Sequence, residues 1–487
     1  MSNTITLGGD KNQQAVTLDL GYANRHGLIA GATGTGKTVS VQVLAEAFSR
    51  HGVPVFLTDV KGDLSGIAQT GKPHKKIDER LAQMPLGEYQ QEANIVRFWD
   101  ILGKNGIPVR LSISDLGPQM LARLLDLNET QEAILTIVFD YADDQGLLLI
   151  NLDDLKTSLN FIQEHSQELS GDYGRISSAS VSAIRRRLLL LEQEGLEDFF
   201  GEPSIEFDDL IEMSNERGMI NLLSAEGIMS TPKTYAIFLL WLMSELFENL
   251  PEIGDPEKPV LALFFDEAHL LFKDCPKIFL NKIEQVVRLI RSKGVGVYFI
   301  TQSPNDIPDS VLGQLGNRIQ HALRAYTPKD VKAVKTAAQS FRPNPEFDTV
   351  KTITDLGLGE ALVSTLEDRG APSIVARTLM APPRSQIGPI TKKARKEIIS
   401  SDDLLDKYIT AVDPESAHEI LKKRRETLSE NAKKETEKQE KAKAKKKTTR
   451  KSSRQGMGEA FLKSMVRSLG GSVGRKLIRG VLGSLLK

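Results

Sequence analysis

The chain has 487 residues, of which 40% are hydrophobic and 26% charged, so it is too long for one compact core and is expected to form two or three globular domains. Its formal charge of −1 hides an asymmetry, because residues 431–487 carry 17 Lys and Arg against 4 Glu while the other 430 residues sum to −14. This distribution excludes a protein that binds nucleic acid over its whole surface, and it leaves local patches or the basic end of the chain for such contacts.

Three features of the sequence favour the cytoplasm. The first residues, MSNTITLGGDKNQQ, have neither the basic region nor the apolar region of a secretory signal. Cys275 is the only cysteine and cannot form an internal disulfide. The best apolar run, at 236–243, is too short to span a bilayer. We therefore expect a cytoplasmic protein.

The first motif in the chain is a P-loop. An apolar strand at Leu28–Ala30 precedes residues 31–38, GATGTGKT, which match G-x-x-x-x-G-K-[ST], and a helix is predicted from Thr38. Glycines permit positive φ and let backbone N–H groups approach phosphates, Lys37 would reach the β- and γ-phosphates of ATP, and the Thr38 hydroxyl would bind Mg²⁺. The predicted nucleotide-binding residues are Gly31, Ala32, Thr33, Gly34, Thr35, Gly36, Lys37, Thr38 and Val39. The alternative is a glycine turn that binds nothing.

Further strands of the same apolar type predict a sheet. They lie at Val55–Asp59, Val109–Ile113, Met219–Leu223, Val260–Asp266, Val297–Thr301 and Ile319–Leu323. Helical patterns separate most of them, which predicts a mainly parallel α/β sheet covered on both faces. After the first of these strands, the sequence DVKGD offers Asp59 and Asp63, which either position metal or water or simply turn the loop.

The pattern between about 116 and 213 is helical throughout. Four segments of helical period follow one another there without a convincing strand. We predict a helical subdomain, 116–213, inserted into a discontinuous ATPase core of 1–115 and 214–385.

The second half of a catalytic site is predicted at residues 261–269, LALFFDEAH. An apolar strand ends there in two adjacent carboxylates. Asp266 would hold Mg²⁺ through water, and Glu267 would orient or deprotonate the attacking water. A surface pair at a strand end is the alternative for both, and His269 is as well explained by a structural role as by a catalytic one.

Two further candidates follow along the chain. Gln302 ends the strand VYFIT and could contact the γ-phosphate or its water, or merely cap a loop. Arg291, ahead of Arg318 and Arg324, is the candidate for completing the site of a neighbouring subunit, a role that elsewhere raises the rate by about 10³–10⁵. Cations at a helix C-terminus are also favoured by the helix dipole alone, which is the structural alternative for Arg291.

The chain after about 385 changes character. Residues 386–455, rich in Lys, Glu and Ala towards their end, predict a charged linker or a solvated helix. Residues 456–487 place an apolar residue at every fourth position with basic residues between, which predicts a basic amphipathic tail helix. Such a helix suits an anionic membrane surface or a protein partner.

Five motifs together resemble the HerA/FtsK branch of P-loop ATPases, including the bacterial HerA-like, helicase-related proteins. They are GATGTGKT (31–38), DVKGD (59–63), LFFDEAH (263–269), RSKGVGVYFITQ (291–302) and LGNRIQHAL (315–323), within a resemblance that covers about 5–385. The resemblance implies a RecA-like core with strand order 5-1-4-3-2, a hexameric ring with ATP between subunits, and movement of double-stranded DNA. It assigns phosphate and Mg²⁺ contacts to Lys37 and Thr38, the metal and water pair to Asp266 and Glu267, the sensor to Gln302 and the arginine of the GRK-type element to Arg291.

The resemblance also sets expectations for partners. Archaeal members carry an N-terminal β-barrel that helps to build the ring, and Gly31 comes too early for one here. We expect other copies of the chain, double-stranded DNA, and a nuclease or another protein as partners. The alternatives are a membrane-peripheral or secretion-type assembly ATPase that docks through its tail, and a nucleotide-binding scaffold without motor action.

Overall fold

The computed structural model describes residues 3–84, 89–227, 232–273 and 277–447. Cys275 and the predicted tail helix at 456–487 lie outside the described residues. The chain divides into two units, Met1–Leu421 and Lys422–Lys487, and the strands of the described residues all lie in the first. The predicted domain boundaries remain predictions.

The strands of the described residues form one large sheet and a small hairpin. The large sheet has twelve strands in the order β2-β1-β14-β13-β12-β3-β11-β10-β4-β9-β5-β6, and β7 pairs with β8. Their bounds are β1 Thr4–Asp10, β2 Ala15–Asp19, β3 Gly27–Ala30, β4 Val55–Asp59, β5 Val96–Asp100, β6 Ile107–Pro108, β7 Met213–Ser214, β8 Arg217–Gly218, β9 Ile220–Ser224, β10 Leu261–Phe265, β11 Val295–Thr301, β12 Asn317–His321, β13 Glu360–Ser364 and β14 Ala376–Met380.

The centre of the sheet is parallel and confirms the RecA-like fold. Counting only the strands that carry the motifs, the order β12-β3-β11-β10-β4 is the 5-1-4-3-2 order that the family resemblance implies. Ala30 on β3 pairs with Thr301 on β11, and Phe264 on β10 pairs with Leu57 on β4. The carboxyl ends of β3, β11, β10 and β4 therefore lie at one edge of the sheet. Each residue predicted for the catalytic site, apart from the arginines, lies at or just after one of these strand ends.

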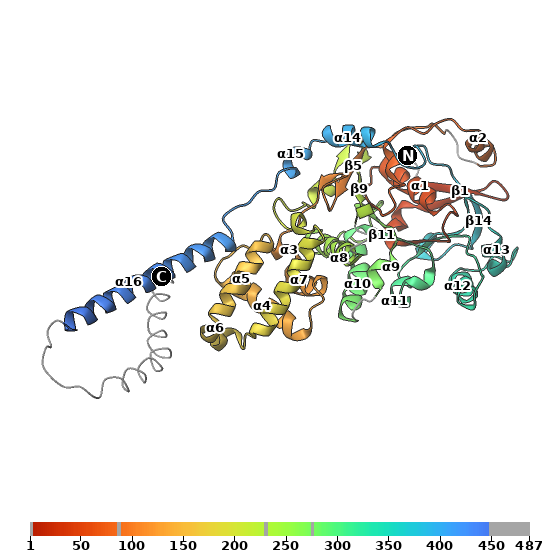
Figure 1. The fold of residues 1–487 in the computed structure, drawn as a ribbon. Helices are drawn as coiled ribbons and strands as arrows, with labels where there is room; N and C mark the ends of the chain where they lie inside the picture. The colour runs from red at the N-terminus through yellow and green to blue at the C-terminus, as the bar shows by residue number, and fades with distance from the viewer. Residues whose placement is uncertain (1–2, 85–88, 228–231, 274–276, 448–487) are drawn as a thin grey trace. The chain divides into compact units, whose positions relative to one another are not determined.

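The helices cover the two faces of the sheet (Figure 1). Their bounds are α1 Lys37–Arg50, α2 Lys75–Leu81, α3 Ile113–Leu124, α4 Glu129–Asp144, α5 Leu152–Glu164, α6 Ser166–Tyr173, α7 Ser178–Gln193, α8 Pro232–Asn249, α9 His269–Phe272, α10 Lys277–Ile290, α11 Asp309–Leu312, α12 Pro328–Gln339, α13 Thr349–Asp355, α14 Lys392–Ser400, α15 Leu405–Tyr408 and α16 Ala417–Lys447.

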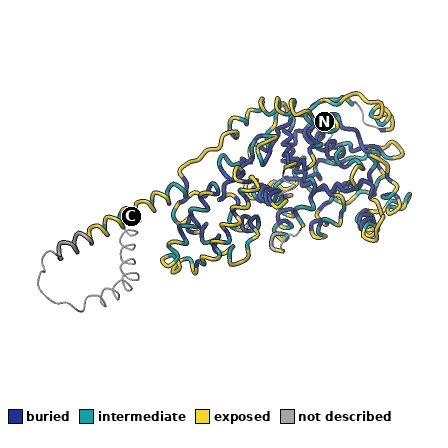
Figure 2. The backbone as a smooth tube through the Cα atoms, in the orientation of Figure 1, coloured by how far each residue is buried: buried dark blue, intermediate teal, exposed yellow. Residues whose placement is uncertain are grey.

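Alternation along the central strands produces two hydrophobic cores. Ile29 and Phe264 point to the face covered by α1, whereas Leu28 and Phe265 point to the face covered by α8 and α10. Because both faces are covered, the strands are apolar along almost their whole length, and Figure 2 shows them buried. The helices α3 to α7 extend the second core and lie together, away from α12 and α13 (Figure 1).

The structure differs from the sequence-based prediction at the margins of the sheet. Val109–Ile113 is not a strand, because β6 ends at Pro108 and Ile113 already begins α3. The strands β1, β2, β5, β13 and β14 were not predicted, and β1, β2, β13 and β14 add an antiparallel side to the parallel centre.

The stretch 386–421 belongs to the first unit. Arg97 on β5 is buried and donates from Nε to Asp402 at 3.0 Å and from Nη2 to Asp403 at 2.7 Å. The buried ring of Tyr408 packs against Trp99 with 5.4 Å between centroids. This segment therefore packs against β5, next to the β6 edge of the sheet.

The second unit is represented by the part of α16 that follows Leu421. Its side chains from 422 to 438 are exposed or partly exposed, as a solvated helix requires, and Figure 2 draws most of them as exposed. Among the helices of the described residues, not one combines the length and the apolar character needed to cross a membrane.

Candidate functional site

The turn between β3 and α1 has the positive φ angles that its glycines predict. Gly34 and Gly36 have φ of 75° and 112°, and Gly31 has φ of 154°. A Cβ on Gly31 would lie 2.5 Å from Cβ of His321, so a side chain there would collide with β12. The backbone N–H of Ala32 donates to the carbonyl of Ala322 at 2.8 Å, which ties the turn to the end of β12.

Lys37 and Thr38 begin α1 and point into the turn. Lys37 Nζ donates to the carbonyls of Gly31 at 2.6 Å and Ala32 at 3.0 Å. Burial lowers the pKa of Lys37, and the positive charge of Lys61 lowers it further. The Thr38 hydroxyl donates to Asp63 Oδ2 at 3.3 Å. The first turn of α1 thus presents an ammonium group and a hydroxyl to one cavity.

Asp266 and Glu267 follow β10 directly and are held by backbone contacts. The Asp266 N–H donates to Thr58 Oγ1 at 2.8 Å, and the hydroxyl of Tyr235 on α8 donates to the Asp266 carbonyl at 2.6 Å. Burial raises the pKa of the Asp266 carboxyl to about 6, and the neighbouring Glu267 charge contributes. Glu267 has φ of 47°, a left-handed conformation that non-glycine residues rarely adopt.

The Glu267 carboxylate is buried among three polar partners. Lys61 Nζ lies 2.6 Å from Oε1, His269 Nδ1 lies 3.3 Å from Oε2, and Gln302 Nε2 lies 3.4 Å from Oε1. Although burial alone would raise its pKa, the Lys61 ammonium, helped by Gln302 and His269, holds the pKa of Glu267 below its usual value. Gln302, expected near the γ-phosphate, therefore contacts the predicted catalytic carboxylate itself.

The loop after β4 is organised by Asp59. This buried carboxylate accepts hydrogen bonds from the N–H groups of Gly62 at 2.7 Å, Asp63 at 3.2 Å and Leu64 at 3.1 Å. Burial raises the pKa of Asp59 to about 7, with the charge of Asp63 adding to the effect. Of the two roles predicted for Asp59, the geometry supports the turn, and the turn delivers Lys61 and Asp63 to the site.

Several of these residues line a cavity of about 390 Å³. Its walls include Thr33, Gly34, Gly36, Lys37, Thr38, Val39, Lys61, Asp63 and Asp266. The hydroxyl of Thr38 and the carboxylates of Asp63 and Asp266 are hard oxygen donors, the chemistry that Mg²⁺ prefers, so the residues fit that ion. Among the described residues, no cluster of three or more His, Cys, Asp or Glu side chains suits a metal held by protein groups alone.

A larger cavity of about 640 Å³ adjoins the first and shares Gly36, Val39, Leu358 and Ile387 with it. Its other walls include Met380–Pro383 and the basic loop and helix that carry Lys72, His74, Lys76 and Arg80. Arg80 donates to the carbonyls of Gly359 and Met380, at 3.0 and 3.1 Å, and so fixes this wall. The cavity combines apolar walls with a basic rim.

Arg291 lies away from both of these cavities. It is exposed and stands four residues before β11, at the edge opposite to the P-loop, where the Asn24 side chain donates to its carbonyl at 3.3 Å. Arg318 is committed to the fold, since it donates to the carbonyls of Leu312 and Leu315 at 2.9 and 3.1 Å. Arg291 therefore does not reach the cavity of its own chain.

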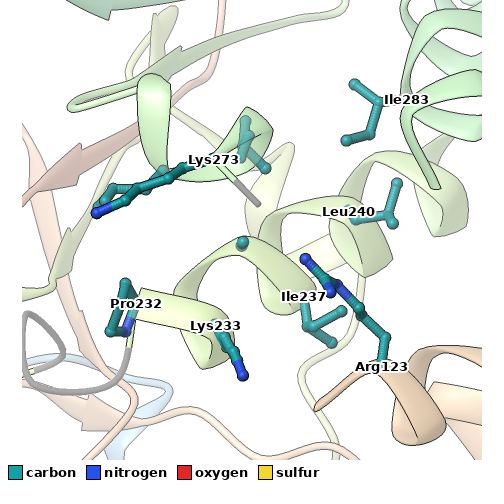
Figure 3. A pocket seen from close by; sticks show the side chains of 10 residues that line it. Arg123, Pro232, Lys233, Ile237, Leu240, Lys273 and Ile283 are labelled. Carbon is teal, nitrogen blue, oxygen red and sulfur yellow. The ribbon is translucent and has the colours of Figure 1, made fainter. Parts of the chain in front are cut away.

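A separate cavity of about 120 Å³ lies between α8, α9 and α10 (Figure 3). Figure 3 shows Ile237, Leu240 and Ile283 as its apolar side and the basic side chains of Arg123, Lys233 and Lys273 around it. Lys233 is paired with Asp126. None of the P-loop residues lines this cavity, so it is not part of the site described above.

Sequence reasoning missed three contributors to the site. Lys61 sits inside the DVKGD motif, and its place after a strand of the sheet is the signal that could have drawn attention to it. His321 likewise sits inside a quoted motif, LGNRIQHAL, whereas Tyr235 lies in none of the five motifs. His321 lies under the P-loop, where Ser40 Oγ is 2.9 Å from Nε2 and burial lowers the histidine pKa to about 4.

Comparison with known proteins gives a family and distant relatives. The family model described as Helicase HerA-like C-terminal matches residues 4–487. The DNA double-strand break repair helicase HerA of Saccharolobus solfataricus is 21% identical over 369 residues, which cover 72% of this chain and 63% of that protein. The helicase of the same name from Sulfurisphaera tokodaii is 22% identical over 360 residues, which cover 72% of this chain and 64% of that protein. The chain thus spans about 63% of the length of these curated relatives. Among solved structures, VirB4 of Thermoanaerobacter pseudethanolicus is 15% identical with a TM-score of 0.49, covering 79% of this chain and 98% of that one.

Proposed function

This chain belongs to the HerA-like helicase C-terminal family of P-loop ATPases, and we propose that it hydrolyses ATP with Mg²⁺ and uses the hydrolysis to move along DNA. The observation that supports hydrolysis most directly is that Lys37, Thr38 and Asp266 line one cavity, while Glu267 contacts Lys61 in its wall. A phosphate-binding turn alone is equally compatible with a scaffold. A buried carboxylate beside it supplies the group that a hydrolase needs.

Each residue has a role in this proposal. Lys37 and the N–H groups of the P-loop bind the β- and γ-phosphates, while Thr38 and Asp266 hold Mg²⁺, with Asp63 within reach of the same hydroxyl. When bound, Mg²⁺ neutralises charge on the phosphates. Glu267 orients the attacking water and accepts its proton, and Gln302 holds the carboxylate in place through the contact at 3.4 Å.

The nucleoside occupies the adjoining cavity of about 640 Å³ in this proposal. The two cavities share Gly36 and Val39, so a molecule with its phosphates on the P-loop continues into the larger one. Its apolar walls at Leu358 and Ile387 suit a purine base.

Steady-state ATP hydrolysis tests the enzymatic part. Lys37→Ala should reduce turnover by about 10²-fold or more, because the phosphates lose their main cation. Lys351→Ala is the matched control, since Lys351 is exposed on α13 outside both cavities, and it should behave as the wild type. Equal turnover in the wild type and Lys37→Ala would refute hydrolysis at this site.

We further propose that the chain works as a hexameric ring in which Arg291 completes the site of a neighbouring copy. Its exposure and its position away from its own cavity support a role outside its own chain. The charge on the γ-phosphate needs compensation beyond Lys37, and an arginine from a neighbour is a recurrent source of it.

DNA as the moved polymer rests on the family and on relatives named as DNA double-strand break repair helicases. Turnover measured with double-stranded DNA, single-stranded DNA or neither, at low and physiological salt, tests it. We expect double-stranded DNA to raise turnover severalfold and salt to weaken the effect. Unchanged turnover with both polymers would remove DNA from the proposal. A nuclease or another protein partner, and a cytoplasmic location, belong to the same proposal.

The basic amphipathic pattern of residues 456–487 favours a second candidate, an assembly ATPase docked on an anionic membrane surface. Co-sedimentation with vesicles of phosphatidylglycerol, compared between the full chain and a chain ending at 430, tests it. Loss of vesicle binding on truncation would support this candidate, and equal partitioning of the two would eliminate it.

A further inference from the structure

Lys61 has no place in the mechanism above, yet it lies at the centre of the site. The turn that carries it is fixed by Asp59, whose carboxylate accepts three backbone hydrogen bonds from residues 62–64. Its ammonium group lies 2.6 Å from Glu267 Oε1, and the residue lines the same cavity as Lys37. Among the described residues that line this cavity, Lys37 and Lys61 are the two with cationic side chains.

The two partners of this ion pair differ in how firmly they are held. The side chain of Glu267 is 6% exposed and has further contacts with His269 and Gln302. The side chain of Lys61 is 44% exposed and sits on a flexible four-carbon stem. Lys61 can therefore change partner without the cost of removing a charge from a buried position, whereas Glu267 cannot.

A phosphate group in this cavity competes for the ammonium group. The terminal phosphate of ATP carries more negative charge than one carboxylate and offers three acceptor oxygens, and charge-assisted hydrogen bonds to it are strong. ADP places no group at that position. The partner of Lys61 then depends on whether a third phosphate is present.

We propose that Lys61 senses the γ-phosphate: with a triphosphate bound it leaves Glu267 for the terminal phosphate, and with a diphosphate it stays on Glu267. The inference rests on the proposed function for the identity of the nucleotide. Lys61 thereby discriminates between ATP and ADP. Its departure frees the Glu267 carboxylate to contact the attacking water only when the β,γ-phosphate bond of ATP is present. No covalent step is added to the reaction.

Equilibrium binding of two probes tests this assignment. The affinities of ADP and of the non-hydrolysable β,γ-imido analogue of ATP, both with Mg²⁺, are measured by calorimetry on the full chain. Lys61→Met should weaken binding of the imido analogue about tenfold or more and that of ADP less than twofold. Lys61→Arg should recover most of the loss, and Lys351→Met should change neither. Equal weakening of both ligands, or of neither, would overturn the proposal.

A double substitution separates contact with the phosphate from an effect through Glu267. If Lys61 merely neutralises the carboxylate, Lys61→Met should have no effect on the imido analogue once Glu267→Gln has removed the charge. If Lys61 contacts the γ-phosphate, the loss should persist at about tenfold in that background, and its disappearance would refute the contact. These measurements report affinity and do not depend on hydrolysis. Absence of ATP turnover in the wild type would refute the proposed hydrolysis and would leave the binding test of Lys61 unaffected.

Discussion

The hydroxyl of Tyr235 donates a hydrogen bond of 2.6 Å to the backbone carbonyl of Asp266, and its oxygen lies 2.8 Å from Thr58 Oγ1. The tyrosine is buried on α8, so the helix on one face of the sheet holds the turn that carries both predicted catalytic carboxylates. Thr58 on β4 and Asp266 after β10 are thereby joined through one side chain.

Tyr235→Phe should lower the free energy of unfolding by about 1–3 kcal/mol, because the Asp266 carbonyl loses its buried partner. It should also lower kcat while leaving the affinity for ADP nearly unchanged, since the turn of Asp266 and Glu267 loses an anchor. Tyr298→Phe is the matched control: its buried hydroxyl donates to the Ala23 carbonyl at 2.9 Å. Urea unfolding and steady-state kinetics on both variants check this, and an equal loss of kcat in the two would contradict it.

Those parts of the site that depend on local spacing could be predicted from sequence. The turn at Gly31–Thr38 and the carboxylates at the end of β10 each lie within one short segment, and the spacing of residue types reflects their geometry. The central strand order followed from the family resemblance, because apolar runs alone do not say which strands are neighbours.

What could not be predicted depends on contacts between distant segments. The cavity beside Val39 is closed by Leu358 and Ile387, more than 300 residues further along the chain. Nothing in the sequence around Arg97 indicates that Asp402, about 300 residues later, is its hydrogen-bond partner. The edge strand β2 has five residues of which only Leu18 is buried, and β1 carries Gly8 and Gly9 in its buried part, so the alternation of apolar residues is weak in both.

Stability should fall as the pH is lowered below 6.5, partly because of His26. Its Nδ1 accepts from the Val297 N–H at 3.0 Å, its Nε2 lies 2.6 Å from the Val287 carbonyl, and burial lowers its pKa to about 4, with Arg291 nearby adding to the effect. The unfolded chain, with an ordinary histidine pKa near 6.5, binds the proton first. The contribution of the neutral ring is therefore complete above 6.5 and is lost as the pH falls towards 4, by on the order of 3 kcal/mol.

Urea unfolding at pH 7.5 and pH 5 measures this dependence. The carboxyls of Asp59 and Asp266 also titrate differently in the folded chain, so the comparison is made between the wild type and His26→Gln. The variant should be less stable at pH 7.5 and should lose less stability on acidification. Equal losses in both proteins would exclude His26 as a source.

Arg291 should act on a neighbouring copy of the chain. Arg291→Ala and Lys37→Ala subunits should each be nearly inactive alone, whereas mixing them should restore part of the turnover, because some sites then combine an intact P-loop with an intact arginine. Turnover at several mixing ratios checks this, with mixed assembly verified by differently tagged subunits. No recovery in confirmed mixed assemblies would leave Arg291 with a structural role.

The central claim is that Glu267 accepts the proton of the water that attacks ATP. The most direct measurement is single-turnover hydrolysis by Glu267→Gln, in which bound nucleotide is quenched and separated into ATP and ADP. The account predicts that the variant binds ATP with Mg²⁺ at least as tightly as the wild type does and retains it intact, with hydrolysis slowed by about 10²-fold or more. Hydrolysis of the bound ATP at the wild-type rate would contradict it.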